Sequence, residues 1–435
     1  MKKHIKLLVV LGIILVGSFS FYLFKGYKKD TIVYENNKIK PSSSGIAMML
    51  ETSAGSGNYE MTTRSEWPTE GYVFNANLSK CENGSELSWD NENKKVLMSG
   101  NKSDKCYVYF DVYVKPQVLL ADYVKSLYVS NNGENGIYYH DASLTNGAGD
   151  NSYRFAGASD AVNNYVCFGS TTTPCPADNL YRIIGVFDDK VKLIKADYTT
   201  SALLGTDGDY KQAYTATGYS SSSYKGNNLA NVAAYTWNYK NNTTINSGYG
   251  SNTWSTSLLN KTNLNKNFIT NIGADWAAKI DTTTWKVGGN TWENIGAQPA
   301  NTAYQNEIVS PVTTNTTDNA TTFSAKIGLM YLSDYMYAAP QDKWTLVGSY
   351  LVDDDASEDY RAATSVNWMY MGLYEWTISR NADGSNSAFS VFNTGDVHSN
   401  YVGRLAFALR PVFYLTSSVN YASGSGSAAD PISIN

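Results

Sequence analysis

The sequence predicts an α+β protein in three parts: an N-terminal transmembrane helix, a small antiparallel β-sandwich and a larger mixed domain. Residues 7–24 are an apolar run interrupted only by Gly and Ser, and the run is just long enough to span a bilayer. Short β-prone segments separated by turn residues follow it, and hairpin and helix signals alternate further on. The expected boundaries are 1–29 for a signal anchor, 30–58 for a tether, 59–117 for the sandwich and 118–435 for the mixed domain.

Lysines flank the apolar run on both sides. A cleaved signal peptide usually has a shorter apolar core and a small-residue exit, whereas residues 21–24 lead directly into Lys25. We therefore expect an uncleaved anchor whose helix has the cell membrane as its partner, with the C-terminal body extracellular. Cleavage near Gly17, followed by secretion, is the alternative.

Four cysteines form two local pairs, Cys81 with Cys106 and Cys167 with Cys175. Neither pair has the short spacing of a zinc site, so two disulfides are expected. Disulfides persist in oxidising compartments, which agrees with an extracellular body. Charged residues make up 17% of the chain and the formal net charge is -5, so the composition gives no reason to expect nucleic acid as a partner.

The first folded unit is predicted from short strands and turns. Strands are expected at 71–75, 86–89, 95–98 and 106–114. Trp89 is expected in the core, and the Cys81–Cys106 bridge compensates for the small buried area of such a unit. We interpret the unit as a spacer domain.

The mixed domain begins with helical periodicity at 118–129. The strongest hairpin signal in the chain follows at 180–187 and 191–196, around a turn at 188–190. Two short helices are expected within 252–269. The stretch 197–251 is rich in Tyr, Ser, Gly and Asn and is too long for a plain connection, so we interpret it as an insertion or irregular functional loop.

The stretch 367–415 is predicted to organise the mixed domain. It opens with a Tyr-rich and Trp-rich run and ends on a β-branched, aromatic strand that begins after Pro411. Arg410 lies immediately before this strand and always carries a charge, so it needs a carboxylate partner. Glu375 or Asp396 could supply a bidentate one, which would join the two ends of the stretch.

Five motifs occur in a fixed order along the mixed domain. They are Tyr-Arg-Ile-Ile-Gly-Val at 181–186, an Asn-x-Trp pattern at 252–259 with Leu264-Asn265, Leu332-Ser333 with Tyr337, Trp-x-x-Ser-Arg at 376–380 and Arg-Pro-x-x-x-Leu at 410–415. Through them, residues 165–420 resemble an uncharacterised domain family of Gram-positive surface and secreted proteins, related to the sulfatase-modifying-factor and C-type-lectin-like fold. The resemblance implies a compact mixed domain closed by a short antiparallel sheet, with Trp254, Trp376 and Arg410 in structural positions.

The enzymes of that superfamily need chemical groups that this chain lacks. Formylglycine-generating enzymes use a late cysteine pair, and no cysteine follows Cys175. The related iron oxidases use a histidine cluster, whereas the body has only His140 and His398. We therefore expect no catalytic residues.

Aromatic and polar side chains of the closing stretch are the candidate ligand-binding residues. They are Trp344, Trp368, Tyr370, Tyr374, Glu375, Asn393 and His398, which could stack on a sugar ring and hydrogen-bond to it. The alternative interpretation places the tryptophans in the core. Asp353, Asp355 and Asp359 stand at alternating positions of an acidic run and could supply oxygens to calcium, but the run lacks the glycine and glutamate of an EF-hand. No other cofactor is suggested.

These observations predict a membrane-tethered, extracellular, non-catalytic binding or adhesion protein. Its ligand would be a glycan or a protein, met by the loops at 197–251 and 381–400. One alternative is a carboxylate-dependent hydrolase of glycans that uses Glu375 or the acids at 353–359. Another is a structural protein of the cell envelope.

Overall fold

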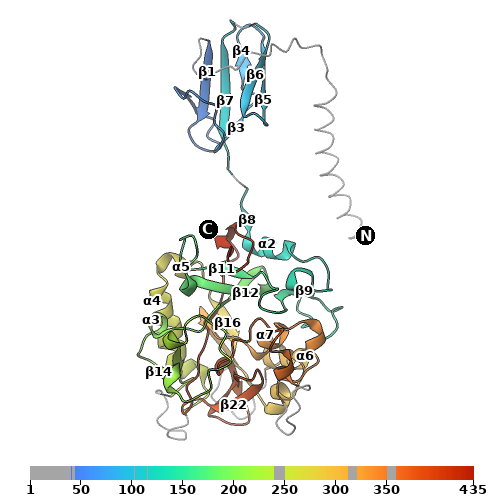
Figure 1. Ribbon diagram of the computed structural model, residues 1–435, viewed down its shortest axis with the longest axis vertical. Helices are drawn as coiled ribbons and strands as arrows, with labels where there is room; N and C mark the ends of the chain where they lie inside the picture. The colour runs from blue at the N-terminus through green and yellow to red at the C-terminus, as the bar shows by residue number, and fades with distance from the viewer. Residues whose placement is uncertain are drawn as a thin grey trace. The chain divides into compact units, whose positions relative to one another are not determined.

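The computed structural model describes residues 41, 45–101, 103–114, 116–239, 250–311, 321–349 and 359–435 (Figure 1). The chain divides into two compact units, residues 1–116 and 117–435. The expected signal anchor at 1–29 and about half of the expected tether, residues 30–40 and 42–44, lie outside the described residues. In the part that the structure describes, no helix is both long enough and apolar enough to cross a membrane.

The predicted α+β class is wrong, because strands make up 31% of the structure and helices only 20%. The helical signals in the sequence correspond to short segments between sheets, of which the longest described has ten residues. Such segments cover the sheets without forming a helical layer of their own.

The first unit is built on a sheet with the order β2-β1-β7-β3, with β4 also pairing with β7. Its strands are β1 (Ile46–Glu51), β2 (Tyr59–Thr62), β3 (Tyr72–Phe74), β4 (Lys80–Cys81) and β7 (Cys106–Val112), and β5 (Glu86–Asp90) pairs with β6 (Lys95–Ser99). β1 and β7 are parallel, so the expectation of a purely antiparallel sandwich is corrected to a mixed one.

The core of the first unit includes a strand that the sequence assigned to the tether. In β1, Ile46, Met48 and Leu50 alternate with more exposed residues and pack against Val108 and Phe110 of β7. This alternation is what a half-buried strand requires. β1 is therefore an inner strand of the sheet, and the folded unit begins well before residue 59.

The main sheet of the second unit contains seven strands in the order β19-β23-β13-β12-β10-β9, with β11 pairing with β12. They are β9 (Ile137–His140), β10 (Ser152–Phe155), β11 (Tyr165–Cys167), β12 (Leu180–Phe187), β13 (Lys190–Lys195), β19 (Ile327–Gly328) and β23 (Val412–Tyr414). The predicted hairpin is confirmed as β12 and β13. Its turn residues Asp188 and Asp189 both have positive φ, as a tight two-residue hairpin turn needs.

A second sheet, β17-β20-β21-β22, carries most of the closing stretch. Its strands are β17 (Gly289–Asn290), β20 (Glu375–Asn381), β21 (Ser387–Val391) and β22 (Val397–Tyr401). Smaller sheets pair β14 (Tyr210–Ala213) with β15 (Ala233–Tyr235), β16 (Thr283–Lys286) with β18 (Thr322–Ala325), and β24 (Asn420–Ser423) with both β8 (Val118–Leu119) and β25 (Ser433–Ile434). The β8–β24 pair joins the beginning and the end of the second unit.

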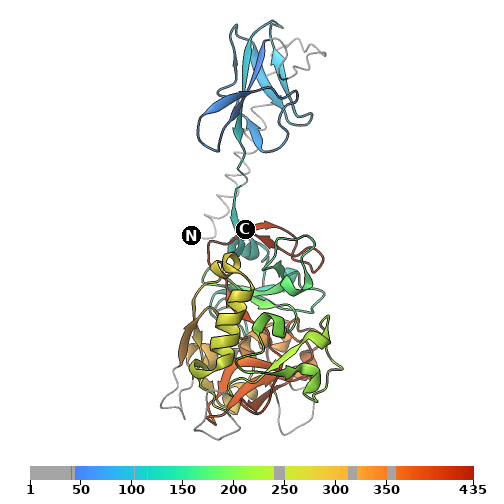
Figure 2. The same ribbon diagram turned by 90° about the vertical axis from the view of Figure 1, so that its left-hand side faces the viewer.

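Short helices connect and cover these sheets. They are α2 (Leu120–Ser126), α3 (Ser201–Leu204), η6 (Leu259–Phe268) continuing into α4 (Ile269–Asn271), α5 (Ala274–Ala278), α6 (Ala300–Tyr304) and α7 (Leu332–Tyr337). Single turns lie at Glu134–Gly136, Ala177–Asn179, Tyr214–Ala216, Leu229–Asn231, Trp254–Thr256, Trp292–Gly296, Gln305–Val309, Gln341–Lys343 and Tyr360–Ala363. Figure 2 shows η6 and α4, in yellow, running along one side of the second unit. The two helices expected within 252–269 are thus a single turn followed by one longer helical segment.

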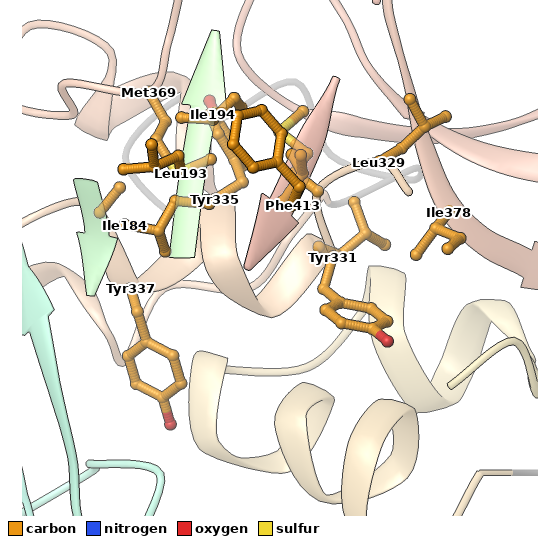
Figure 3. Close-up of a cluster of buried hydrophobic side chains, with 14 of the residues drawn as sticks. Ile184, Leu193, Ile194, Leu329, Tyr331, Tyr335, Tyr337, Met369, Ile378 and Phe413 are labelled. Carbon is orange, nitrogen blue, oxygen red and sulfur yellow. The ribbon is translucent and has the colours of Figure 1, made fainter. Parts of the chain in front are cut away.

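The core of the second unit lies between the main sheet and α7. Leu193 and Ile194 of β13 and Phe413 of β23 gather beside Tyr331 and Tyr335 (Figure 3). All five side chains are almost completely buried. Aromatic side chains fill much of this core, which explains the high aromatic content of the sequence.

Candidate functional site

The predicted ion pair between the two ends of the closing stretch is confirmed. Arg410 donates from Nε to Oε1 of Glu375 at 2.8 Å and from Nη2 to Oε2 at 2.9 Å, and Nη2 also donates to the carbonyl of Met369 at 2.7 Å. Burial lowers the pKa of Arg410, but the Glu375 carboxylate outweighs it and holds this pKa above its usual value. Glu375 is buried and already bonded at both oxygens, so it has a structural role in this geometry.

The candidate tryptophans lie in the core. Trp344, Trp368 and Trp376 are at most 1% exposed. Their indole N–H groups donate to the carbonyls of Ala339, Phe155 and Tyr235 respectively. Trp254, 2% exposed, packs against Trp237 with ring centroids 4.8 Å apart. None of these four rings offers a face to a sugar, which agrees with the core interpretation.

The candidates Tyr370, Tyr374, Asn393 and His398 are brought near one another. The Tyr370 hydroxyl donates to the carbonyl of Asn393, and the Tyr374 and Phe392 rings have centroids 4.4 Å apart. The His398 ring stacks on Phe392, with ring centroids 3.9 Å apart. Tyr370 is buried, whereas Tyr374, Asn393 and His398 are partly exposed.

His398 forms a close pair with Asp396. The distance between His398 Nε2 and Asp396 Oδ2 is 2.5 Å, and Ser349 Oγ donates to the same oxygen at 3.4 Å. Burial raises the pKa of Asp396, but hydrogen bonds from His398 and Thr394 outweigh it and leave this pKa below its usual value. In the described hydrogen bonds, the His398 ring has Asp396 as its partner.

The predicted loop at 197–251 lies against the closing stretch, whereas the predicted loop at 381–400 is mostly the β21–β22 hairpin. Trp237 donates from its backbone N–H to the carbonyl of Val402 and from its indole to the carbonyl of Thr377, both at 2.9 Å. Asn252 donates through its side-chain amide to the carbonyls of Asn381 at 2.8 Å and Gly384 at 2.7 Å. These bonds hold the end of the first segment, and Asn252 just after it, against β20 and the β20–β21 connection. Residues 240–249 lie outside the described part.

A polar hollow opens beside the β21–β22 hairpin. Its volume is 470 Å³, and it is lined by Ser387, Ser399, Asn400, Tyr401, Arg404 and Leu405. Tyr401 and Arg404 are exposed, with Tyr401 at 43%. Asn381 donates to Ser399 Oγ at 2.7 Å and Asn400 donates to Ser390 Oγ at 2.9 Å, so the floor of the hollow is held in place. The hollow combines a cation, an aromatic face and neutral hydrogen-bonding groups.

Arg404 and Tyr401 were missed by the sequence reasoning, because the predicted loop stopped at residue 400. The available signal was weak: an exposed Tyr and Arg three residues apart, after a strand of polar residues.

Other hollows offer different chemistry. One of 480 Å³ in the first unit has Tyr72, Phe74, Trp89 and Tyr113 in its lining. One of 270 Å³ includes Asp197, but that carboxylate already accepts hydrogen bonds from Tyr224 Oη at 2.9 Å and from the backbone of Asn227 at 2.8 Å. The largest of these, 600 Å³, is lined mainly by glycine, alanine and other uncharged residues.

The predicted calcium ligands are placed only in part. Asp353 and Asp355 lie outside the described residues. Asp359 is buried, caps the turn at Tyr360–Ala363 through the backbone N–H of Arg361 at 2.9 Å, and forms an ion pair with the Arg361 guanidinium at 2.7 Å. Within the described ranges, no group of three or more His, Cys, Asp or Glu residues is arranged to hold a metal ion.

No protein-family model, curated protein or solved structure matches the chain. The relationship to the C-type-lectin-like fold therefore stays a prediction.

Proposed function

We propose that the protein is an exported, non-catalytic binding protein whose second unit recognises an acidic glycan at the hollow beside β21 and β22. The observation that carries this proposal is the lining of that hollow. Arg404 supplies a cation for a carboxylate or sulfate, Tyr401 supplies a ring for stacking, and Ser399 and Asn400 supply neutral hydrogen-bonding groups. A sugar acid offers a partner for each of these three kinds of group.

Two disulfides support the exported location. Cys81–Cys106 and Cys167–Cys175 are both formed, and the described chain has no free cysteine. Disulfides of this kind persist outside the reducing cytoplasm. Binding at the cell surface is consistent with that chemistry.

The hydrolase alternative receives less support from the geometry. Glu375, one of its two candidate sources of carboxylate, is buried and bonded to Arg410 at both oxygens. The carboxylates of a glycosidase must instead face each other across a cleft that admits substrate and water.

The test is glycan-array binding by a soluble form that contains residues 41–435, with and without calcium. Acidic glycans should bind, and Arg404→Gln should weaken that binding at least about tenfold, the effect of losing one charge-assisted contact. Tyr113→Ala removes an exposed tyrosine from the first-unit hollow and serves as the matched control, with binding expected to stay unchanged. Loss of binding in the control alone would move the site to the first unit, and silence on the array with retention on peptidoglycan would favour an envelope component.

A further inference from the structure

A group of charged side chains lies inside the second unit, away from the proposed binding hollow. Lys192 on β13, Asp334 in α7 and Arg154 on β10 are each at most 3% exposed. Lys192 Nζ lies 2.5 Å from Asp334 Oδ2, and Arg154 Nη2 lies 2.5 Å from Asp150 Oδ2. The group therefore consists of two ion pairs, with Arg154 Nη1 also 3.9 Å from Asp334 Oδ1.

Aromatic rings surround the Lys192 amine. Its Nζ lies 4.6 Å from the ring centroid of Tyr331, 5.4 Å from those of Phe187 and Tyr414, and 5.9 Å from that of Trp285. Tyr331 is drawn among the core side chains in Figure 3. These rings keep bulk water away from the amine and from the carboxyl group that it touches.

The low polarity of this site works against the ionised form of the pair. Desolvating two charges costs several kcal/mol for each ion unless other bonds compensate. Burial lowers the pKa of Lys192, although Asp334 opposes that effect. For an amide to form, one proton passes along the 2.5 Å contact from Nζ to Oδ2, which leaves an amine beside a carboxylic acid. These are the two reactive partners for forming an amide.

We propose that Lys192 and Asp334 are joined by an intramolecular amide bond. The Nζ lone pair attacks Cγ of Asp334, a C–N bond forms, and the C–Oδ2 bond breaks. Of the three ammonium protons, one stays on the amide nitrogen and two pass to Oδ2, which leaves as water, so no oxidant or other reactant is needed.

The surroundings of Asp334 suit this reaction. Arg154 Nη1 lies 3.9 Å from Oδ1, where negative charge develops in the tetrahedral intermediate, and the backbone N–H of Tyr331 donates to Oδ2 at 2.9 Å and holds the carboxyl group in place. Glu307 accepts hydrogen bonds from the backbone N–H groups of Leu332 at 3.0 Å and Ser333 at 2.9 Å, and so fixes the first turn of α7. After the reaction Arg154 keeps Asp150 as its partner, so no buried charge is left unpaired.

The same strand provides an internal control. Lys190 Nζ lies 2.5 Å from Asp281 Oδ2, but these side chains are 40% and 25% exposed. Water stabilises that pair in its ionised form, so it should stay non-covalent. The nitrogen–oxygen distance is the same in the two pairs, and the pairs differ in the solvent exposure of their side chains.

Mass spectrometry of the full chain tests the proposal. The denatured protein should weigh one water molecule less than its sequence with two disulfides. After reduction and trypsin digestion, residues 191–195 should be recovered uncleaved at Lys192 and joined to residues 327–343. Recovery of the separate peptides 191–192 and 193–195, with the full sequence mass, would overturn the proposal.

Variants locate the bond. Lys192→Arg and Asp334→Ala should each restore the missing water, whereas Lys190→Arg should keep the mass deficit and the joined peptides. If the Lys192→Arg variant still weighs one water molecule less than its sequence, the water is lost at another site and the Lys192–Asp334 amide is refuted. Because the unaltered protein already gives a decisive mass, failure of a variant to fold does not weaken the test.

Discussion

Glu375 and Arg410 place a bidentate ion pair inside the core, where each charge depends on the other. Glu375→Gln should lower the free energy of unfolding of the second unit by about 3 kcal/mol, because Arg410 is then buried without a counter-charge. Denaturant unfolding measures this loss. Glu293→Gln, on an exposed glutamate, is the matched control and should change stability by less than about 0.5 kcal/mol. Equal losses in both variants would contradict the structural role assigned to Glu375.

Asp104 predicts a pH dependence for the first unit. Burial raises the pKa of Asp104, but hydrogen bonds from Ser85 and Asn83 outweigh it and lower this pKa to about 2, from the ordinary value of 3.8. Since the folded-state pKa is depressed, Asp104 stabilises the unit fully above about pH 4 and loses this effect as the pH falls toward 2.

The Asp104→Asn variant checks that dependence. It should be less stable than the unaltered protein at about pH 7, and the difference should shrink toward zero near pH 2. Glu92→Gln, on an exposed acid of the same unit, should follow the unaltered protein at both values. A difference for Asp104→Asn that does not change with pH would show that the carboxylate charge is not responsible.

For single residues, the sequence predicted which side chain required a partner more reliably than it predicted whether a side chain faced the core or a ligand. The partner of Arg410 was predictable to within two residues, because a guanidinium before a core strand requires a carboxylate, and Glu375 and Asp396 were the two candidates. Whether Trp344 and Trp368 face the core or a ligand was not predictable, because an indole ring suits a core as well as a ligand site. Arg404 became a candidate only when the fold placed it beside Tyr401 and Ser399.

Among the strands, local signals decided which could be found in advance. The β12–β13 hairpin has strong β-formers around a two-residue turn, so its pairing can be predicted from the local sequence. β1 pairs in parallel with β7, some sixty residues later in the chain. The residues around β1 carry no turn signal that would predict so distant a partner. The residues 47–49 of β1, Ala-Met-Met, are also weak β-formers.

The inner position of β1 gives a prediction about truncation. A chain that starts at residue 59 should leave the first unit unfolded, because β7 then lacks its parallel neighbour and the core lacks Ile46, Met48 and Leu50. A chain that starts at residue 41 should fold. Amide hydrogen exchange in β7 measures the difference, and strong protection of β7 in the shorter chain would contradict the assignment.

For the whole molecule, the two separate cores predict two unfolding transitions. Replacing Cys81 and Cys106 by Ser should destabilise the first unit by about 3 kcal/mol, because the bridge closes a 25-residue loop. The transition of the second unit should not move. Replacing Cys167 and Cys175 is the reciprocal control, and a shared shift of both transitions would argue against independent units.

The fold class was mispredicted for a reason that acts on the whole chain. Helical periodicity at 118–129 and within 252–269 was real, but it produced helices of one to three turns rather than a helical layer. Long loops rich in Tyr and Asn wrap the sheets instead, and their buried tyrosines complete the core.

The pairing of β8 with β24 brings the entry and exit of the second unit onto neighbouring strands. A module whose ends lie close together can be inserted into a host polypeptide, because the insertion barely changes the spacing of the residues that flank it. Genetic grafting of residues 117–435 into an exposed turn of an unrelated carrier is therefore a practical route to displaying it.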